Sequence, residues 1–115
     1  MYVHDDAIGV EYGPFYTTDE VVQCLDSLNR GELGWDLFYN KLKAVVNREG
    51  LKMSRSRNGN IIIEAPDGAP LAIVKPDLER LIVKVDTWHG LTGTYPMNHV
   101  GAELCVRLAL RELTY

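Results

Sequence analysis

The chain has few cysteines, no long apolar run and almost no basic side chain in its first third. Its two cysteines, Cys24 and Cys105, have a spacing that fits no zinc-binding or redox motif. No apolar segment approaches the roughly 20 residues that a membrane-spanning helix needs. The first ten residues also lack the basic start and apolar stretch of a signal peptide. We therefore expect a cytoplasmic protein with two buried, reduced thiols and no contact with a membrane.

The recognisable signatures of catalysis are also missing. The three histidines, His4, His89 and His99, do not have the close spacing of a metal site, and no glycine-rich phosphate loop is present. A nucleophilic site of Cys24, His89 and Asp86 is conceivable, but Cys24 falls in the middle of a helical pattern. No helix N-terminus would lower the pKa of its thiol there. We predict a protein that is not an enzyme and that uses no cofactor and no metal.

The composition predicts one folded domain that covers residues 1–115. The chain has 115 residues, of which 46% are hydrophobic and 24% are charged, and its net charge is −4. Such a composition is ordinary for a globular domain, and a chain of this length can bury roughly two thirds of its unfolded surface.

Three helices are expected. Thr17 and Glu20 have the spacing of a capping box, and the helix that they begin should end before Gly31. Apolar residues three and four apart predict a second helix from Trp35 to Glu49. A third helix, from about Asn98 to Glu112, is apolar on almost every side, so it is either covered on two sides or leaves a patch for a partner.

Residues 51–86 predict an antiparallel meander of four short strands. The turns are marked by Asn58-Gly59 and by two further proline- or glycine-containing segments. One short strand is expected at Ala7–Tyr12, and residues 87–97 are interpreted as a loop. The fold class is therefore α+β, with a three- to four-stranded antiparallel meander packed with two N-terminal helices and one C-terminal helix.

The charge is distributed unevenly along the chain. Residues 1–36 hold one basic side chain, Arg30, and eight acidic ones: Asp5, Asp6, Glu11, Asp19, Glu20, Asp26, Glu32 and Asp36. We predict that these carboxylates form one negative surface that attracts a basic partner. The alternative is a solvated face that only aids solubility.

Two other segments could make contacts with a partner. The loop at 87–97 carries Trp88, His89 and Tyr95, and aromatic side chains of this kind anchor protein interfaces. The alternative is that Trp88 folds back over the end of the sheet. A basic trio, Lys52 with Arg55 and Arg57, could touch phosphate, but protection of an edge strand explains it better in an acidic protein.

The chain resembles the small accessory proteins of bacteriophages and prophages. The similarity covers residues 51–115, with a hairpin-rich middle and a last helix that ends in Leu108-Ala109-Leu110-Arg111-Glu112-Leu113, in a short acidic chain. Some proteins of that kind inhibit host defence, including CRISPR effector nucleases, by occupying a basic nucleic-acid or target-recognition surface. The resemblance implies a bacterial host cytoplasm and carries over no catalytic residue.

These observations predict a non-catalytic binding protein that occupies a basic surface of a macromolecular partner, such as a nucleic-acid-binding nuclease. The chain itself is not expected to bind nucleic acid, because it is acidic overall. The alternative is a self-associating accessory protein that forms a homodimer through the C-terminal helix. A small enzyme is the least favoured class.

Overall fold

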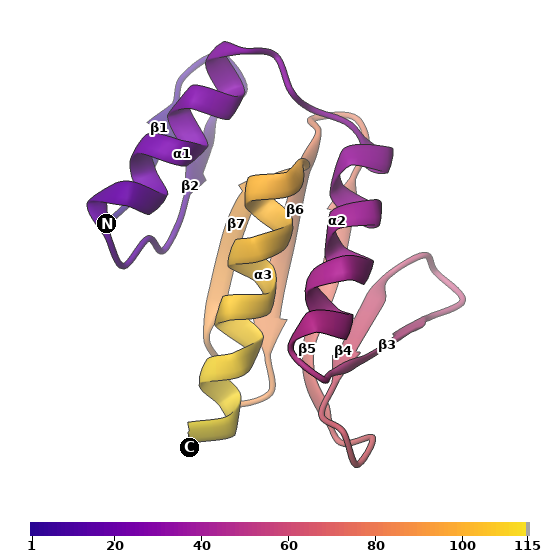
Figure 1. Cartoon of the computed structure of the whole chain (residues 1–115). Coiled ribbons are helices and arrows are strands. Elements are labelled where there is room, and N and C mark those ends of the chain that lie inside the picture. The colour runs from indigo at the N-terminus through magenta and orange to yellow at the C-terminus, as the bar shows by residue number, and fades with distance from the viewer. Residues whose placement is uncertain (115) are drawn as a thin grey trace.

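The helices of the protein cover one face of a five-stranded antiparallel sheet. The computed structural model describes residues 1–114 (Figure 1). In chain order the elements are β1 (Val3–Asp5), β2 (Val10–Tyr12), α1 (Thr18–Asn29), α2 (Trp35–Arg48), β3 (Lys52–Arg55), β4 (Ile61–Glu64), β5 (Pro70–Asp77), β6 (Ile82–Thr87), β7 (Thr92–Pro96), α3 (His99–Arg111) and a terminal 3-10 turn, η1 (Glu112–Thr114).

The main sheet is a simple meander in the order β3-β4-β5-β6-β7, so each strand pairs with its neighbour in sequence. The first two strands form a separate hairpin. That hairpin lies beside the β7 edge, because the backbone N–H of Gly13 donates to the carbonyl of Thr94 at 2.8 Å and the reverse bond has the same length. The α+β class is confirmed, but the structure has one strand more in the meander than predicted and an additional hairpin.

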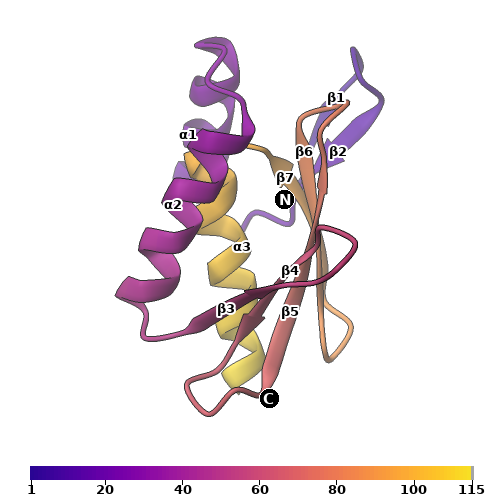
Figure 2. The ribbon, with the colours of Figure 1, turned by 90° about the vertical axis from the view of Figure 1, so that its right-hand side faces the viewer.

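The strand register places the aliphatic side chains on the face that the helices cover. Ile61 lies opposite Val74, which lies opposite Val85, and all three are fully buried. Alternate residues of a strand point to opposite faces, so this row defines the inner side. Figure 2 shows α2 and α3 on that side, whereas the N-terminal hairpin stands on the other side. The core therefore lies between the sheet and the helix layer.

Helix α3 is apolar all round because it is covered on several sides. It packs against α2, α1 and the strands β5, β6 and β7. Val106, which lies off its main apolar face, is as buried as Cys105 and Leu108. Of the two alternatives stated for this helix, the structure shows the first, in which α3 is covered on more than one side. A homodimer through this helix stays a prediction.

The interpretation of residues 87–97 as a loop is also wrong. Five of these residues, Thr92–Pro96, form β7, which pairs along its length with β6. Gly93 and Pro96 made the segment look irregular in sequence. A side chain at Gly93 would meet the carbonyl oxygen of Gly13 at 3.1 Å and the ring of Tyr95 at 2.9 Å, so glycine is required where the hairpin approaches. Of the strand expected at 7–12, only β2 (Val10–Tyr12) is present, because residues 7–9 belong to the turn that joins β2 to β1.

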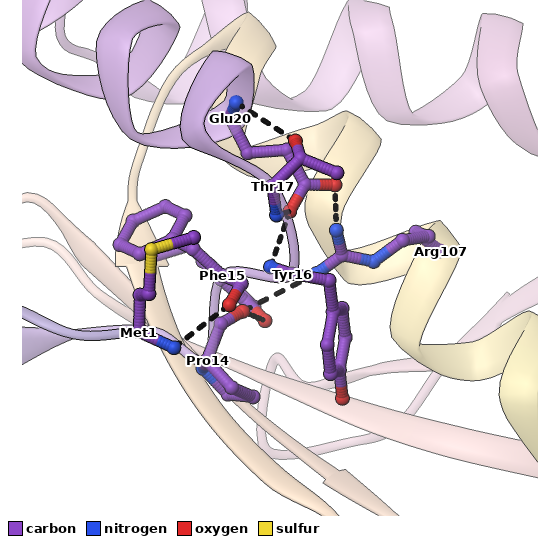
Figure 3. A network of polar contacts seen from close by, with 8 residues as sticks. Met1, Pro14, Phe15, Tyr16, Thr17, Glu20 and Arg107 are labelled. Carbon is purple, nitrogen blue, oxygen red and sulfur yellow. Dashed lines mark hydrogen bonds and ion pairs between the residues drawn. The ribbon is translucent and has the colours of Figure 1, made fainter.

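Arg107 of α3 ties the start of α1 to the rest of the molecule (Figure 3). Its guanidinium pairs with Glu20, donates to the carbonyl of Pro14 at 3.2 Å and lies 4.3 Å from the ring centre of Tyr16. Glu20 also completes the predicted capping box, since the backbone N–H of Glu20 donates to the Thr17 hydroxyl at 3.2 Å. One side chain thus holds the N-terminal segment, the cap of α1 and α3 together.

None of the helices within residues 1–114 combines the length and the apolar character that crossing a bilayer requires.

Candidate functional site

The eight acidic side chains of the first third do not form one surface. Three belong to the N-terminal hairpin (Asp5, Asp6 and Glu11), three to α1 (Asp19, Glu20 and Asp26), and Glu32 and Asp36 lie in the following connection and in the first turn of α2. The hairpin and α1 lie on opposite sides of the main sheet (Figure 2). The prediction of a single negative surface is therefore wrong.

Several of these carboxylates also have a partner within the chain. Glu20 is engaged by Arg107, Asp6 lies 2.9 Å from the His4 ring, and Asp26 lies 3.3 Å from Arg30. Both side chains of the Asp26–Arg30 pair are exposed, and exposed ion pairs contribute little free energy. A basic group of a partner can therefore replace Arg30 at this carboxylate. Glu20 is different, because it is 20% exposed and serves as a cap, so it is not free for a partner.

What remains of the acidic surface is the outward face of α1. Val22 and Leu25 are 57% and 40% exposed there. Asp19 precedes them and Asp26 follows them on the same side, since positions three, four and seven apart share a helix face. The inward side of the helix buries Cys24 and Ser27. The face thus presents two aliphatic side chains between two carboxylates. We call the surface formed by Asp19, Val22, Leu25 and Asp26 the α1 face.

A hollow of about 270 Å³ adjoins the C-terminal end of the α1 face. Asp26 and Arg30 line it from α1, Glu32 from the connection to α2, and His99 from the first turn of α3. Glu32 is half-buried and adds a second carboxylate, beside Asp26, to this end of the helix. The hollow extends the acidic character of α1 toward α3 without adding an apolar wall large enough for a small molecule.

The three predicted anchors of the segment 87–97 are not brought to this face. Trp88 and His89 lie in the turn between β6 and β7, which Figure 1 places at the opposite end of the sheet from α1. Trp88 is 69% exposed, so it is available to a partner but remote from the acidic helix. Tyr95 is fully buried, and its hydroxyl donates to the carbonyl of Pro14 at 2.8 Å. Tyr95 is a core residue, and its assignment as an anchor is wrong.

The turn with His89 is fastened to the C-terminal end of α3 through Glu112. The backbone N–H of His89 donates to one carboxylate oxygen of Glu112 at 2.9 Å, and the ring Nδ1 contacts the other. Burial opposes ionisation of Glu112, but hydrogen bonds from Thr87 and His89 outweigh it and hold the pKa of Glu112 below its usual range.

This depressed pKa predicts a loss of stability in acid. The ionised form of Glu112 is favoured in the folded state, so its contribution is complete above the unfolded pKa of about 4.3 and disappears as the pH falls through the lower folded pKa. We expect the free energy of unfolding of E112Q to be lower than that of the wild type at pH 7 and to depend less on pH below about 4.3. Urea titrations across this range, with E79Q at an exposed turn as the control, measure the difference; parallel pH profiles for wild type and E112Q would contradict it.

The residues that could have formed a nucleophilic site lie apart. Cys24 belongs to α1, whereas His89 lies in the turn at the other end of the sheet (Figure 1). Burial raises the pKa of the Cys24 thiol to about 11, and it also raises the pKa of the fully buried Cys105. Neither thiol is a thiolate at neutral pH. Within residues 1–114, no three His, Cys, Asp or Glu side chains are grouped as a metal site would require.

A second surface, which the sequence did not indicate, lies between α2 and the turns of the sheet. It is a hollow of about 490 Å³ lined by Trp35, Arg55, Asn58, Gly59, Asn60, Pro76 and Leu78. Trp35, the first residue of α2, is only half-buried, whereas Phe38 one turn later is fully buried. We call the hollow lined by these residues the Trp35 groove.

Trp35 and Arg55 line one side of the Trp35 groove, and the ring of Tyr39 lies next to both. The rings of Trp35 and Tyr39 are stacked with centres 5.1 Å apart and planes inclined by 15°. The guanidinium of Arg55 lies 5.1 Å from the ring centre of Trp35 and 5.6 Å from that of Tyr39. Lys43 lies 5.2 Å from the Tyr39 ring. Cation–π contacts of this kind hold the basic groups in place without neutralising their charge.

The hairpin between β3 and β4 positions Arg55 for this contact. β3 is an edge strand, as the basic trio had indicated. Arg55 lies opposite Ile61, which is a buried inner residue, so Arg55 points to the helix side of the sheet rather than away from it. The Asn58-Gly59 turn is formed with a positive φ of 87° at Gly59 alone. Only the strand register, and no local pattern, brings Arg55 to the tryptophan.

The chain matches no known family description, no curated protein and no solved structure.

Proposed function

We propose that this protein is a non-catalytic binding protein that docks the α1 face against a basic, partly apolar surface of a macromolecular partner. The observation that carries the proposal is the exposure of Val22 and Leu25 between Asp19 and Asp26. A helix that lays an apolar stripe into a groove is a common mode of protein recognition. Charged residues at the border of such a stripe steer the encounter and select the partner.

The position of α1 supports this proposal. The helix packs chiefly on α3 and stands at the side of the helix layer, where Figure 1 shows its outer side uncovered. The anchor of Glu20 to Arg107 fixes its first turn, so the face is presented by a rigid element. Among basic partners, a nucleic-acid groove of a host defence nuclease is the class that the resemblance to phage proteins favours. Inhibition would then be steric and electrostatic occupancy of that groove.

Charge reversal of the α1 face tests the proposal. We expect the double variant D19K/D26K to lose at least about tenfold in affinity for its partner, because long-range attraction becomes repulsion. The protein is immobilised, exposed to a bacterial lysate at low salt and eluted at high salt, and the affinity for any retained protein is then measured. The control, D6K/E79K, makes the same change of net charge at exposed positions outside α1.

Two results would contradict the proposal. One is a partner that D19K/D26K binds as tightly as the wild type does. The other is a partner that the control variant loses equally, since the effect would then follow net charge and not the α1 face. Replacement of Val22 by serine gives an independent check, because it removes exposed apolar area without changing charge.

A further inference from the structure

We propose that the Trp35 groove is a second binding site, of opposite charge to the α1 face, and that it takes an acidic peptide segment of a partner protein. In this site an aspartate or glutamate carboxylate meets Arg55, and an adjacent apolar side chain packs against Trp35 and Leu78. The groove belongs to other elements than α1, so this site does not depend on the function proposed above.

The first argument is the state of Arg55. Four other arginines, Arg30, Arg48, Arg80 and Arg107, each pair with a carboxylate of the chain. Arg55 has no carboxylate partner within residues 1–114, and its contacts are with the two aromatic rings. A cation–π contact does not use the N–H donors of a guanidinium as a salt bridge does, and their planar arrangement matches a carboxylate.

The second argument is the apolar content of the groove. Leu78 is 65% exposed, and it lies with Pro76 and Trp35 around the same hollow. Tryptophan and arginine, which lie together here, are among the residues that are most enriched in interface hot spots. A volume of about 490 Å³ accommodates a few side chains. The site therefore suits a ligand that combines a carboxylate with an apolar group.

The third argument is local charge. Lys43 adds a second cation on the Tyr39 ring, whereas Asp77 beside the groove is already paired with Arg80 at 3.0 Å. Among the described residues that line the groove, Arg55 is the one charged side chain, so the groove carries a positive charge in a protein with a net charge of −4. Complementary charge favours an anionic ligand at this place.

A peptide fits these observations better than a nucleic acid does. The Trp35 and Tyr39 rings stack on each other and Arg55 covers both, so little free ring face is left for a base.

Tryptophan fluorescence provides the experiment. The chain has two tryptophans, and W88F leaves Trp35 as the only one. This variant is titrated with a blocked short peptide of alternating aspartate and leucine, with the same peptide carrying asparagine in place of aspartate, and with an oligothymidylate. We expect saturable binding of the acidic peptide, at least about tenfold weaker binding of the asparagine peptide, and weaker binding of the oligothymidylate.

The variants R55Q and R57Q separate the groove from general charge. Both remove one arginine of the same hairpin, but Arg57 does not line the hollow. We expect R55Q to weaken the acidic peptide at least about tenfold and R57Q to change it less than about twofold. Thermal unfolding of both variants verifies that the fold is kept.

Three outcomes would overturn the inference: equal binding of the acidic and asparagine peptides, tighter binding of the oligothymidylate, or equal losses in R55Q and R57Q. Self-association that R55Q abolishes in sedimentation would make a second copy the occupant and would also overturn it. None of these outcomes bears on the binding role proposed for the α1 face, which the variant D19K/D26K tests separately.

Discussion

Replacement of Gly101 by alanine is expected to lower the free energy of unfolding by about 3 kcal/mol. A Cβ at this position would lie 1.8 Å from the carbonyl oxygen of Pro96 and 3.0 Å from its carbonyl carbon. Both atoms belong to the backbone, so the strand end and the helix must move apart. The higher helix propensity of alanine, worth about 1 kcal/mol, offsets only part of this cost.

Urea unfolding of G101A against the wild type measures the effect. The control is H99A, which changes a half-exposed residue in the same first turn of α3 and is expected to shift stability by less than about 0.5 kcal/mol. A G101A variant as stable as the wild type would show that α3 does not approach β7 as closely as described.

Replacement of Arg107 by methionine is expected to cost about 2 kcal/mol, and its effect should be concentrated in α1. Methionine retains most of the apolar volume but leaves Glu20, which is 20% exposed, without its cation. The carbonyl of Pro14 loses one of its two donors and keeps the Tyr95 hydroxyl. Burial lowers the pKa of Arg107 to about 10, so the pair is ionic at neutral pH.

The control for this prediction is R111M. Arg111 lies over the same ring, 4.0 Å from the centre of Tyr16, but it is exposed and is not part of the cap of α1, which Thr17 and Glu20 form. We expect R111M to cost less than about 1 kcal/mol. Amide hydrogen exchange should become faster in α1 of R107M and remain unchanged in α1 of R111M. A uniform increase over the whole chain in R107M would contradict a local anchor.

A double-mutant cycle extends the test to the pair itself. E20Q preserves the capacity to cap the helix, because glutamine can replace glutamate in a capping box. We expect R107M and E20Q to be non-additive by about 1 to 2 kcal/mol if their side chains act together. Additive losses would show that Arg107 stabilises the fold through Pro14 and Tyr16 and not through Glu20.

Local patterns in the sequence were sufficient to predict the helices and most of the strands. Thr17 and Glu20 predicted the start of α1, and the spacing of Phe38 and Leu42 predicted the buried side of α2. β7 was missed because the reason for its Gly93 lies in the distant Gly13, which no local pattern contains.

The candidate sites were less accessible to sequence reasoning, because each depends on a long-range partner. The predicted acidic surface failed where Arg107, from the other end of the chain, engages Glu20. The Trp35 groove was missed for the same reason, since the residues that form it come from α2, the first hairpin of the sheet, the end of β5 and the turn after it. An arginine three residues before an Asn-Gly turn resembles the solvated arginines of many edge strands until the register is known.

Site-specific photo-crosslinking tests the binding role of the α1 face most directly. A benzophenone side chain is placed at Val22, on the α1 face, or at Ala44, on the exposed side of α2, and the protein is irradiated in a bacterial lysate. The account predicts a protein adduct from position 22 that D19K/D26K suppresses, and little or none from position 44. Adducts of equal yield from the two positions, or an adduct at position 22 that persists after charge reversal, would contradict it.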